Sequence, residues 1–132
     1  MLRTFPKGGI HPPENKLTAD KPVVTLPLPQ VVTVMLSQHI GAPAIPVVSK
    51  GDSVKAGQLI AEAKGFVSAN IHSPVSGTVA KIEPVTDTTG YRQMAVIINT
   101  EGDIWEDNVD HGDDLHREIT LTREEIIARC LS

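Results

Sequence analysis

The apolar residues of this chain come in short runs, separated by glycine, proline and polar turns. The segments 58–63 (QLIAEA) and 78–83 (TVAKIE) place alternate residues on opposite faces with a period of two, which is typical of half-buried strands. In the first of them, Ile60 and Glu62 are predicted to share one face. The segment 94–100 (MAVIINT) is apolar on both faces and predicts an inner strand.

The apolar segment 23–36 (VVTLPLPQVVTVML) is interrupted by Pro27 and Pro29. Proline has no backbone N–H to donate to a sheet, so it is confined to edge strands and turns. The segment therefore predicts an edge strand, a turn, and a second strand over 31–36.

Glycines mark the expected turns of this region. Gly51 and Gly57 lie in Lys-Gly-Asp and Ala-Gly-Gln turns, where glycine supplies the positive φ that other residues resist. Gly77 follows Pro-Val-Ser in another tight turn. If its φ is positive, Gly77→Val is expected to cost roughly 1–3 kcal/mol through backbone strain.

The two ends of the chain differ from its middle, and four segments are predicted. Residues 1–22 are rich in Pro, Gly and Lys and predict an extended arm, whereas 23–100 hold the strands. Residues 101–121 are acidic and predict a surface connector. Residues 122–132 begin with Thr-Arg-Glu-Glu, which fits a capping box at the start of a helix. Because no glycine closes that helix, we expect it to lead into a further domain.

Composition agrees with a mainly β domain and excludes several functions. The chain has 132 residues, and its 14 Val, 12 Ile and 11 Thr favour strands. A single cysteine, Cys130, excludes an internal disulfide and a zinc or iron–sulfur site built from the cysteines of this chain. The positive charges of residues 1–100 are scattered without aromatic residues between them, which argues against nucleic acid as a partner. No apolar run reaches membrane-spanning length, so we expect a soluble, intracellular chain that does not insert into a membrane.

The segment 63–83 is typical of the modified hairpin in biotinyl and lipoyl carrier domains. Such hairpins carry one lysine at the tip, to which the cofactor is attached. At the carrier spacing from Pro74, this position holds Phe66, which has no amine. Lys64 lies two residues earlier, on the strand before the tip, and is predicted to be an ordinary solvated lysine.

No catalytic, cofactor-binding or metal-binding residue is predicted. His11, His39 and His72 are far apart and lack a carboxylate or thiol at ligand spacing, so a hydrogen-bonded structural role is expected for each. The acidic segment 107–114 fails the calcium-loop template. No glycine-rich phosphate loop or nucleophile elbow occurs.

Three stretches together carry a family resemblance. They are FPKGGIHPPENK (5–16), SQHIGAPAIPVVSKGDSVKAGQLIAEA (37–63) and FVSANIHSPVSGTVAKIEP (66–84). They resemble the amino-terminal domain of RnfC, the C-subunit of the Rnf ion-translocating ferredoxin:NAD oxidoreductase. The resemblance implies a barrel-sandwich hybrid, the fold of biotinyl and lipoyl carriers, with an amino-terminal arm and a carboxyl-terminal helix.

The resemblance also implies a setting. The parent subunit would lie peripherally at the cytoplasmic face of the bacterial inner membrane, in a complex that moves electrons between NADH and ferredoxin and couples this to ion transport. Its downstream domain would bind FMN and NADH, and two [4Fe–4S] clusters would follow. This fragment would be non-catalytic and would contact that downstream domain and other Rnf subunits.

Three alternatives remain open from the sequence. They are a true biotinyl or lipoyl carrier, the hairpin domain of a periplasmic efflux adaptor, and the related A-subunit of the sodium-pumping NADH:quinone reductase. Phe66 argues against the first, the lack of heptads against the second, and the GGIHPPENK segment against the third.

The arm has two possible roles. It is either a strand that closes the barrel or a docking strip for the flavin domain, made of Gly8, Gly9, His11, Pro12 and Pro13. The glycines would allow close backbone approach, and the prolines would fix the shape of the strip before binding.

Overall fold

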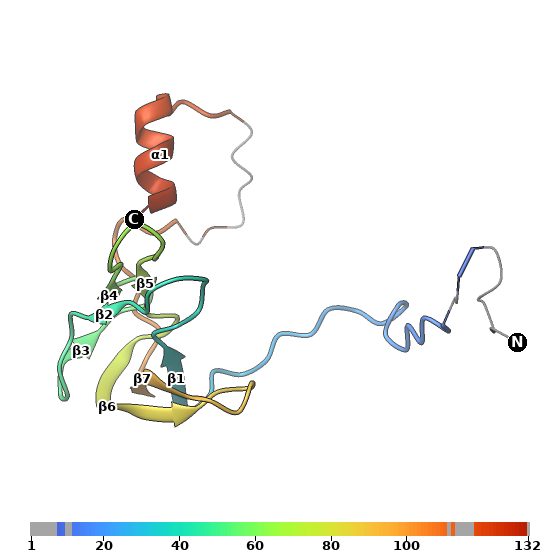
Figure 1. Ribbon diagram of the computed structural model, residues 1–132, viewed down its shortest axis with the longest axis horizontal. Helices are drawn as coiled ribbons and strands as arrows, with labels where there is room; N and C mark the ends of the chain where they lie inside the picture. Colours follow the sequence, from blue (N-terminus) through green and yellow to red (C-terminus); the bar gives the residue numbers. More distant parts are fainter. Residues whose placement is uncertain (1–7, 10–11, 111, 113–117, 132) are drawn as a thin grey trace, which may run out of the picture.

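The computed structural model describes residues 8–9, 12–110, 112 and 118–131. Two antiparallel sheets face each other (Figure 1). The strands are β1 (Val31–Met35), β2 (Ile45–Pro46), β3 (Ser53–Val54), β4 (Leu59–Glu62), β5 (Ile71–His72), β6 (Gly77–Thr86) and β7 (Arg92–Thr100). Their orders are β1-β7-β6-β3 in the larger sheet and β2-β4-β5 in the smaller one. This confirms the predicted mainly β fold.

The predicted inner strand is confirmed. β7 lies between β1 and β6, so both of its edges are paired with other strands. Its residues Ala95, Val96 and Ile98 are buried, and the first two are neighbours that point to opposite faces of the sheet. This explains why the sequence of this strand is apolar without alternation.

The alternation predicted for 58–63 is wrong for part of β4. The pairing of β4 with β5 shifts register between Leu59 and Ala61. Because of this irregularity Ile60 and Ala61 are both buried, whereas Glu62 is exposed and no longer shares a face with Ile60. In β6, a second shift lies between Val79 and Lys81. Beyond this shift the side chains alternate as predicted for 78–83: Lys81 is exposed and Ile82 packs against the core.

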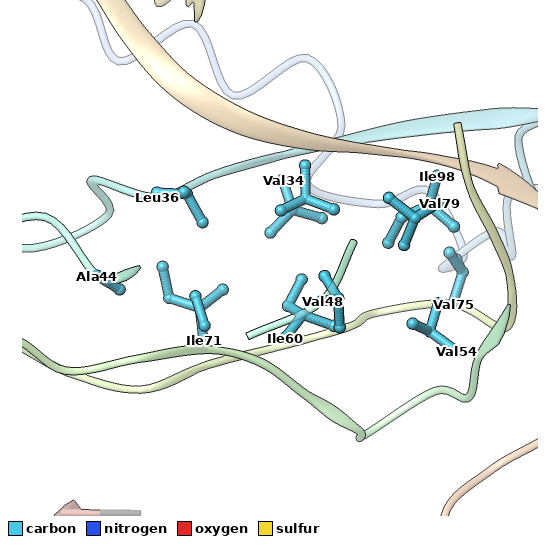
Figure 2. Close-up of a cluster of buried hydrophobic side chains, with 12 residues drawn as sticks. Val34, Leu36, Ala44, Val48, Val54, Ile60, Ile71, Val75, Val79 and Ile98 are labelled. Carbon is cyan, nitrogen blue, oxygen red and sulfur yellow. The ribbon is translucent and has the colours of Figure 1, made fainter. Parts of the chain in front are cut away.

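One small core lies between the sheets and takes side chains from every strand except β2. Figure 2 shows these side chains converging from the two layers. They are Val34, Leu36, Ala44, Val48, Val54, Ile60, Ala61, Ile71, Val75, Val79, Val96 and Ile98. All are aliphatic, so hydrophobic burial without aromatic packing holds the sheets together.

The predicted edge strand over the first part of 23–36 is wrong. Only Val31–Met35 is a strand, while 22–29 have no regular structure and are exposed. Prolines at 22, 27 and 29 remove N–H donors from this stretch, which leaves too few to pair with the free edge of β1. The arm runs away from the barrel (Figure 1).

The first part of the acidic connector is a strap, residues 101–109, that returns to the barrel. Buried Ser76 joins it twice, since Ser76 Oγ donates to Glu101 O (2.8 Å) and accepts from Ile104 N (3.0 Å). Ala56 N donates to Ile104 O, and Glu106 N donates to Ala56 O, each at 2.9 Å. The ordered unit therefore extends past the last strand into the strap.

The predicted capping box is present at the start of α1 (Arg123–Leu131). Glu125 Oε2 accepts hydrogen bonds from Thr122 N (2.7 Å) and Thr122 Oγ1 (2.8 Å), and Thr122 O accepts from Ile126 N (3.0 Å). The apolar residues Ile126 and Ile127 are 39% and 47% exposed, so the described part of the chain does not cover this helix.

We predict that acidification loosens α1. The backbone N–H of Thr122 and then its hydroxyl lower the pKa of Glu125 below its usual value of 4.5. A carboxyl whose folded pKa is lowered adds stability above its usual pKa, and this is lost as the pH falls through the lowered value. The protection of the α1 amides, measured relative to the intrinsic exchange rate at each pH, is therefore expected to fall below pH 4.5. Thr122→Ala, an N-cap loss worth about 1 kcal/mol, should lower this protection at pH 7. Glu125→Gln, which removes the titrating carboxyl, should remove the acid step, and an acid step that persists in Glu125→Gln would contradict this origin.

Candidate functional site at the hairpin tip

The loop between β4 and β5 is the place where a carrier domain would bear its cofactor. This tip comprises residues 63–70, and it is packed against the loop 38–43 that follows β1. Hydrogen bonds join the two loops. Ala42 N donates to Val67 O (3.0 Å), and Ser68 Oγ donates to Ala42 O (2.9 Å).

The tip is also closed on itself. Ser68 Oγ accepts from Lys64 N, and Asn70 Oδ1 accepts from Ala63 N, both at 2.9 Å. Gly41 makes the contact between the loops possible. With a φ of +106°, its backbone lies so close to Val67 that a Cβ at this position would overlap the Val67 carbonyl oxygen.

His39 has the structural role that the sequence predicted for it. Its Nε2 accepts from Ala69 N (3.1 Å), and its Nδ1 lies 3.1 Å from Ile40 O. Since a backbone N–H can only donate, Nε2 is the acceptor and Nδ1 carries the proton that Ile40 O accepts. Both ring nitrogens are thus engaged by the backbone, and His39 fixes the tip to the neighbouring loop.

The side chains at the tip point to solvent although the backbone is fixed. Phe66 is 104% exposed, Ile40 89% and Val67 52%. Phe66 is thus fully exposed in the tip loop, at the sequence position where a carrier would present its lysine. Lys64 is exposed, and its backbone N–H donates to Ser68 Oγ. Its predicted place on the strand before the tip is wrong, because β4 ends at Glu62 and Lys64 lies in the tip loop.

The residues described here offer no further chemistry at the tip. His72 is exposed on β5, and His11 lies outside the described residues. Within the described ranges, no group of three or more His, Cys, Asp or Glu side chains could hold a metal ion. Likewise, none of the helices described is long and apolar enough to cross a membrane.

The predicted docking strip lies elsewhere, on the arm. Gly8, Gly9, Pro12 and Pro13 are exposed, with φ of 108° at Gly8 and 80° at Gly9. None of the described residues of the arm, 8–9 and 12–22, belongs to a strand, so this part of the arm does not close the barrel.

A family comparison agrees with this fold. Residues 4–103 match the model of the RnfC barrel sandwich hybrid domain. The chain belongs to this family. The match includes β1 to β7 and the beginning of the strap, and this RnfC-type domain therefore has the fold that the sequence predicted.

Named relatives agree with the family, and each is the C-subunit of its complex. The chain is 44% identical over 111 residues to that of the proton-translocating ferredoxin:NAD(+) oxidoreductase complex of Clostridium ljungdahlii, which covers 83% of this chain and 24% of that protein. It is 45% identical over 97 residues to that of the Na(+)-translocating ferredoxin:NAD(+) oxidoreductase complex of Acetobacterium woodii, covering 73% of this chain and 22% of that protein. The chain is 41% identical over 103 residues to the C-subunit of the ion-translocating oxidoreductase complex of Pseudomonas aeruginosa. This match covers 76% of this chain and 13% of that protein. This RnfC-type domain thus spans about a quarter or less of the length of these relatives.

The sequence predicted the tip and the position of Phe66, but not the hydrogen bonds that fix the tip. His39 and Gly41 lie about 30 residues before the loop that they hold. The QHIGAP segment contributed to the family resemblance, yet no local pattern indicates that it packs against 63–70.

Proposed function

We propose that this chain is the amino-terminal domain of an RnfC-type subunit and acts as a non-catalytic structural and docking module. Phe66 carries the proposal. A carrier domain needs an amine at the tip of its hairpin, and here that sequence position holds a phenyl ring that is 104% exposed. The fold of a carrier is thus used without an attached group.

The parent would be a peripheral subunit at the cytoplasmic face of the bacterial inner membrane. Its complex would transfer electrons between NADH and ferredoxin and couple this to ion translocation, as the names of the relatives indicate for their own complexes. We place FMN, NADH and the two [4Fe–4S] clusters in other parts of the parent. The single cysteine of this chain, Cys130, is exposed on α1 and cannot hold a tetranuclear cluster alone.

Co-purification tests this function. The full-length protein that contains this domain is tagged and isolated from gently solubilised membranes. We expect other subunits of one ion-translocating complex to accompany it, together with NADH-dependent ferredoxin reduction or its reverse. A tagged protein that is active in another assembly, or that carries biotin or lipoate, would refute the proposal.

Within this function, the arm is proposed to dock on the flavin domain of the same polypeptide. Leu17 of the arm is 83% exposed, and the segment that joins the arm to β1 exposes Val23, Val24, Leu26 and Leu28 by 56–101%. An apolar, exposed arm loses conformational entropy and gains no burial unless it packs on something. The proline-stiffened strip around Pro12 and Pro13 would lie at its start.

The double change His11→Ala with Pro12→Ala separates docking from barrel structure. We expect the melting curve of the isolated domain to stay nearly unchanged, within about 0.5 kcal/mol, because Pro12 is exposed and outside the barrel. In the full-length protein, hydrogen exchange should become faster in the arm and in the flavin domain. If the isolated domain instead loses several kcal/mol, the arm is part of the barrel.

A further inference from the structure

The tip combines a fixed backbone with exposed apolar side chains, a combination that does little for the stability of the domain itself. Hydrogen bonds such as that from Ala69 N to His39, about 30 positions away, order the loop at a cost in conformational entropy. A loop without a partner gains little from this ordering. It gains less from exposing Phe66, because burying a phenylalanine side chain is favourable by about 1.5–3 kcal/mol. We infer that the tip inserts Phe66 into an apolar pocket on another protein subunit of the complex.

The shape of the tip identifies the kind of partner surface. Phe66 stands fully exposed at the end of the hairpin, with Ile40 and Val67 as a smaller apolar shoulder at 89% and 52% exposure. A convex anchor of this kind buries its surface only in a concave pocket. Aromatic anchors in pockets, surrounded by polar residues that exclude water, are typical of the central contacts of protein interfaces.

The charges around the tip favour a protein over a membrane. Lys64 is the only lysine or arginine between Lys55 and Lys81, and the exposed carboxylate of Glu62 lies two positions before it. The chain as a whole carries a net charge of −4. Hairpins that bind anionic lipid headgroups need an excess of basic residues, with each Lys or Arg contributing about 1 kcal/mol. The tip has no such excess, so lipid is the weaker candidate.

The fixation of the backbone favours another subunit over a neighbouring domain of the same chain. Domains in one polypeptide meet at an effective concentration of about 1 mM or more, so a weak and adaptable contact is enough to join them. Association between separate chains loses translational and rotational freedom as well, and preordered loops offset part of that loss. His39, Ser68 and Asn70 order this loop before any partner arrives.

Figure 1 separates this surface from the arm. The arm leaves the barrel beside β1 and extends away from it, whereas the β4–β5 loop lies at the opposite side of the sheets. The two surfaces can therefore contact different partners at the same time. The tip contact rests on the proposed membership of a multi-subunit complex, and it adds a second interface to that function.

Photo-crosslinking in native membranes tests the inference. The photoreactive amino acid p-benzoyl-phenylalanine replaces Phe66 in the full-length protein, and in a matched variant it replaces Tyr91, an aromatic residue that is 71% exposed on the β6–β7 hairpin. After irradiation, position 66 should give a crosslink to a polypeptide of another subunit, and position 91 should not. Crosslinks from position 66 to lipid, to the same polypeptide only, or to nothing would overturn the inference.

A second variant pair measures the strength of the contact. Phe66→Ala should reduce retention of the full-length protein on salt-washed membranes by at least about 10-fold, the effect expected of an aromatic anchor, and Phe66→Leu should restore part of it. Tyr91→Ala should leave retention unchanged, and all three variants should melt like the wild type because both side chains are exposed. Retention of Phe66→Ala equal to the wild type overturns the inference and leaves the proposed function intact. Failure of the wild-type protein to co-purify with any other subunit refutes the proposed function itself.

Discussion

Replacing Gly77 by alanine is expected to lower the free energy of unfolding by about 3–4 kcal/mol, and valine by at least as much. Gly77 is buried at the start of β6, with a φ of +154°. A Cβ at this position would overlap the backbone carbonyl oxygen of Asn99 in β7. Relief requires the two longest strands to move apart, which strains the backbone and weakens their pairing. This exceeds the roughly 1–3 kcal/mol that strain alone predicts from the sequence.

Gly51→Ala is the matched control for this change. Gly51 also has positive φ, +95°, but a Cβ there would meet nothing within 4 Å. Gly51→Ala should therefore lower the free energy of unfolding by only about 1–2 kcal/mol, the cost of a left-handed backbone for a residue with a Cβ. Chemical unfolding of both variants gives the comparison. Equal losses for the two variants would mean that the close approach to Asn99 is unimportant.

Ile98→Ala is expected to cost about 3–4 kcal/mol, in the range of buried isoleucine truncations. Ile98 is 0% exposed on the central strand, where its neighbours Val32 and Val79 pair with it from β1 and β6. Few residues can move to fill the space, because the core contains only small aliphatic side chains.

Ile97→Ala provides the comparison within the same strand. Ile97 points to the opposite face of β7 and is half-buried, so its truncation should cost about 1 kcal/mol. Chemical unfolding of the two variants separates burial in the core from the β propensity of isoleucine. If Ile97→Ala proved as destabilising as Ile98→Ala, the outer face of the larger sheet would also have to be a core.

Local patterns predicted the parts of the fold that depend on neighbours in sequence. The inner strand β7, the strand at 31–36 and the Thr122–Glu125 capping box were all predicted correctly, because apolar runs and short spacings encode them. A tight turn at Gly77 was expected, and Gly77 has the positive φ on which the cost of Gly77→Val was made conditional.

The features that sequence analysis missed depend on contacts between distant residues. The irregularity in β4 buries Ile60 and Ala61 together, and no period in the sequence signals such a shift. The strap beyond β7 is held by Ser76, whose hydroxyl could have bonded almost any nearby backbone group. The acidic composition of this segment suggested a solvated connector. Composition carries no information on backbone pairing, so the return of the strap to the barrel was missed.

The candidate site likewise has one feature that the sequence predicted and one that it did not. The carrier spacing placed Phe66 at the tip, and the structure finds it fully exposed there. The loop that fixes the tip came only from the structure, because His39 bonds to Ala69 across 30 positions. The absence of the carrier amine was thus predictable, whereas the preordered surface that replaces it was not.

Peptide mass mapping of the protein from its native membrane tests the central claim, which is that a carrier fold serves here without a carried group. Trypsin cleaves after Lys55, Lys64 and Lys81, so an unmodified chain yields the peptides 56–64 and 65–81. We expect both peptides at their unmodified masses. Attachment of biotin or lipoate to Lys64 would block cleavage there, and a single peptide 56–81 carrying the added mass would contradict the account.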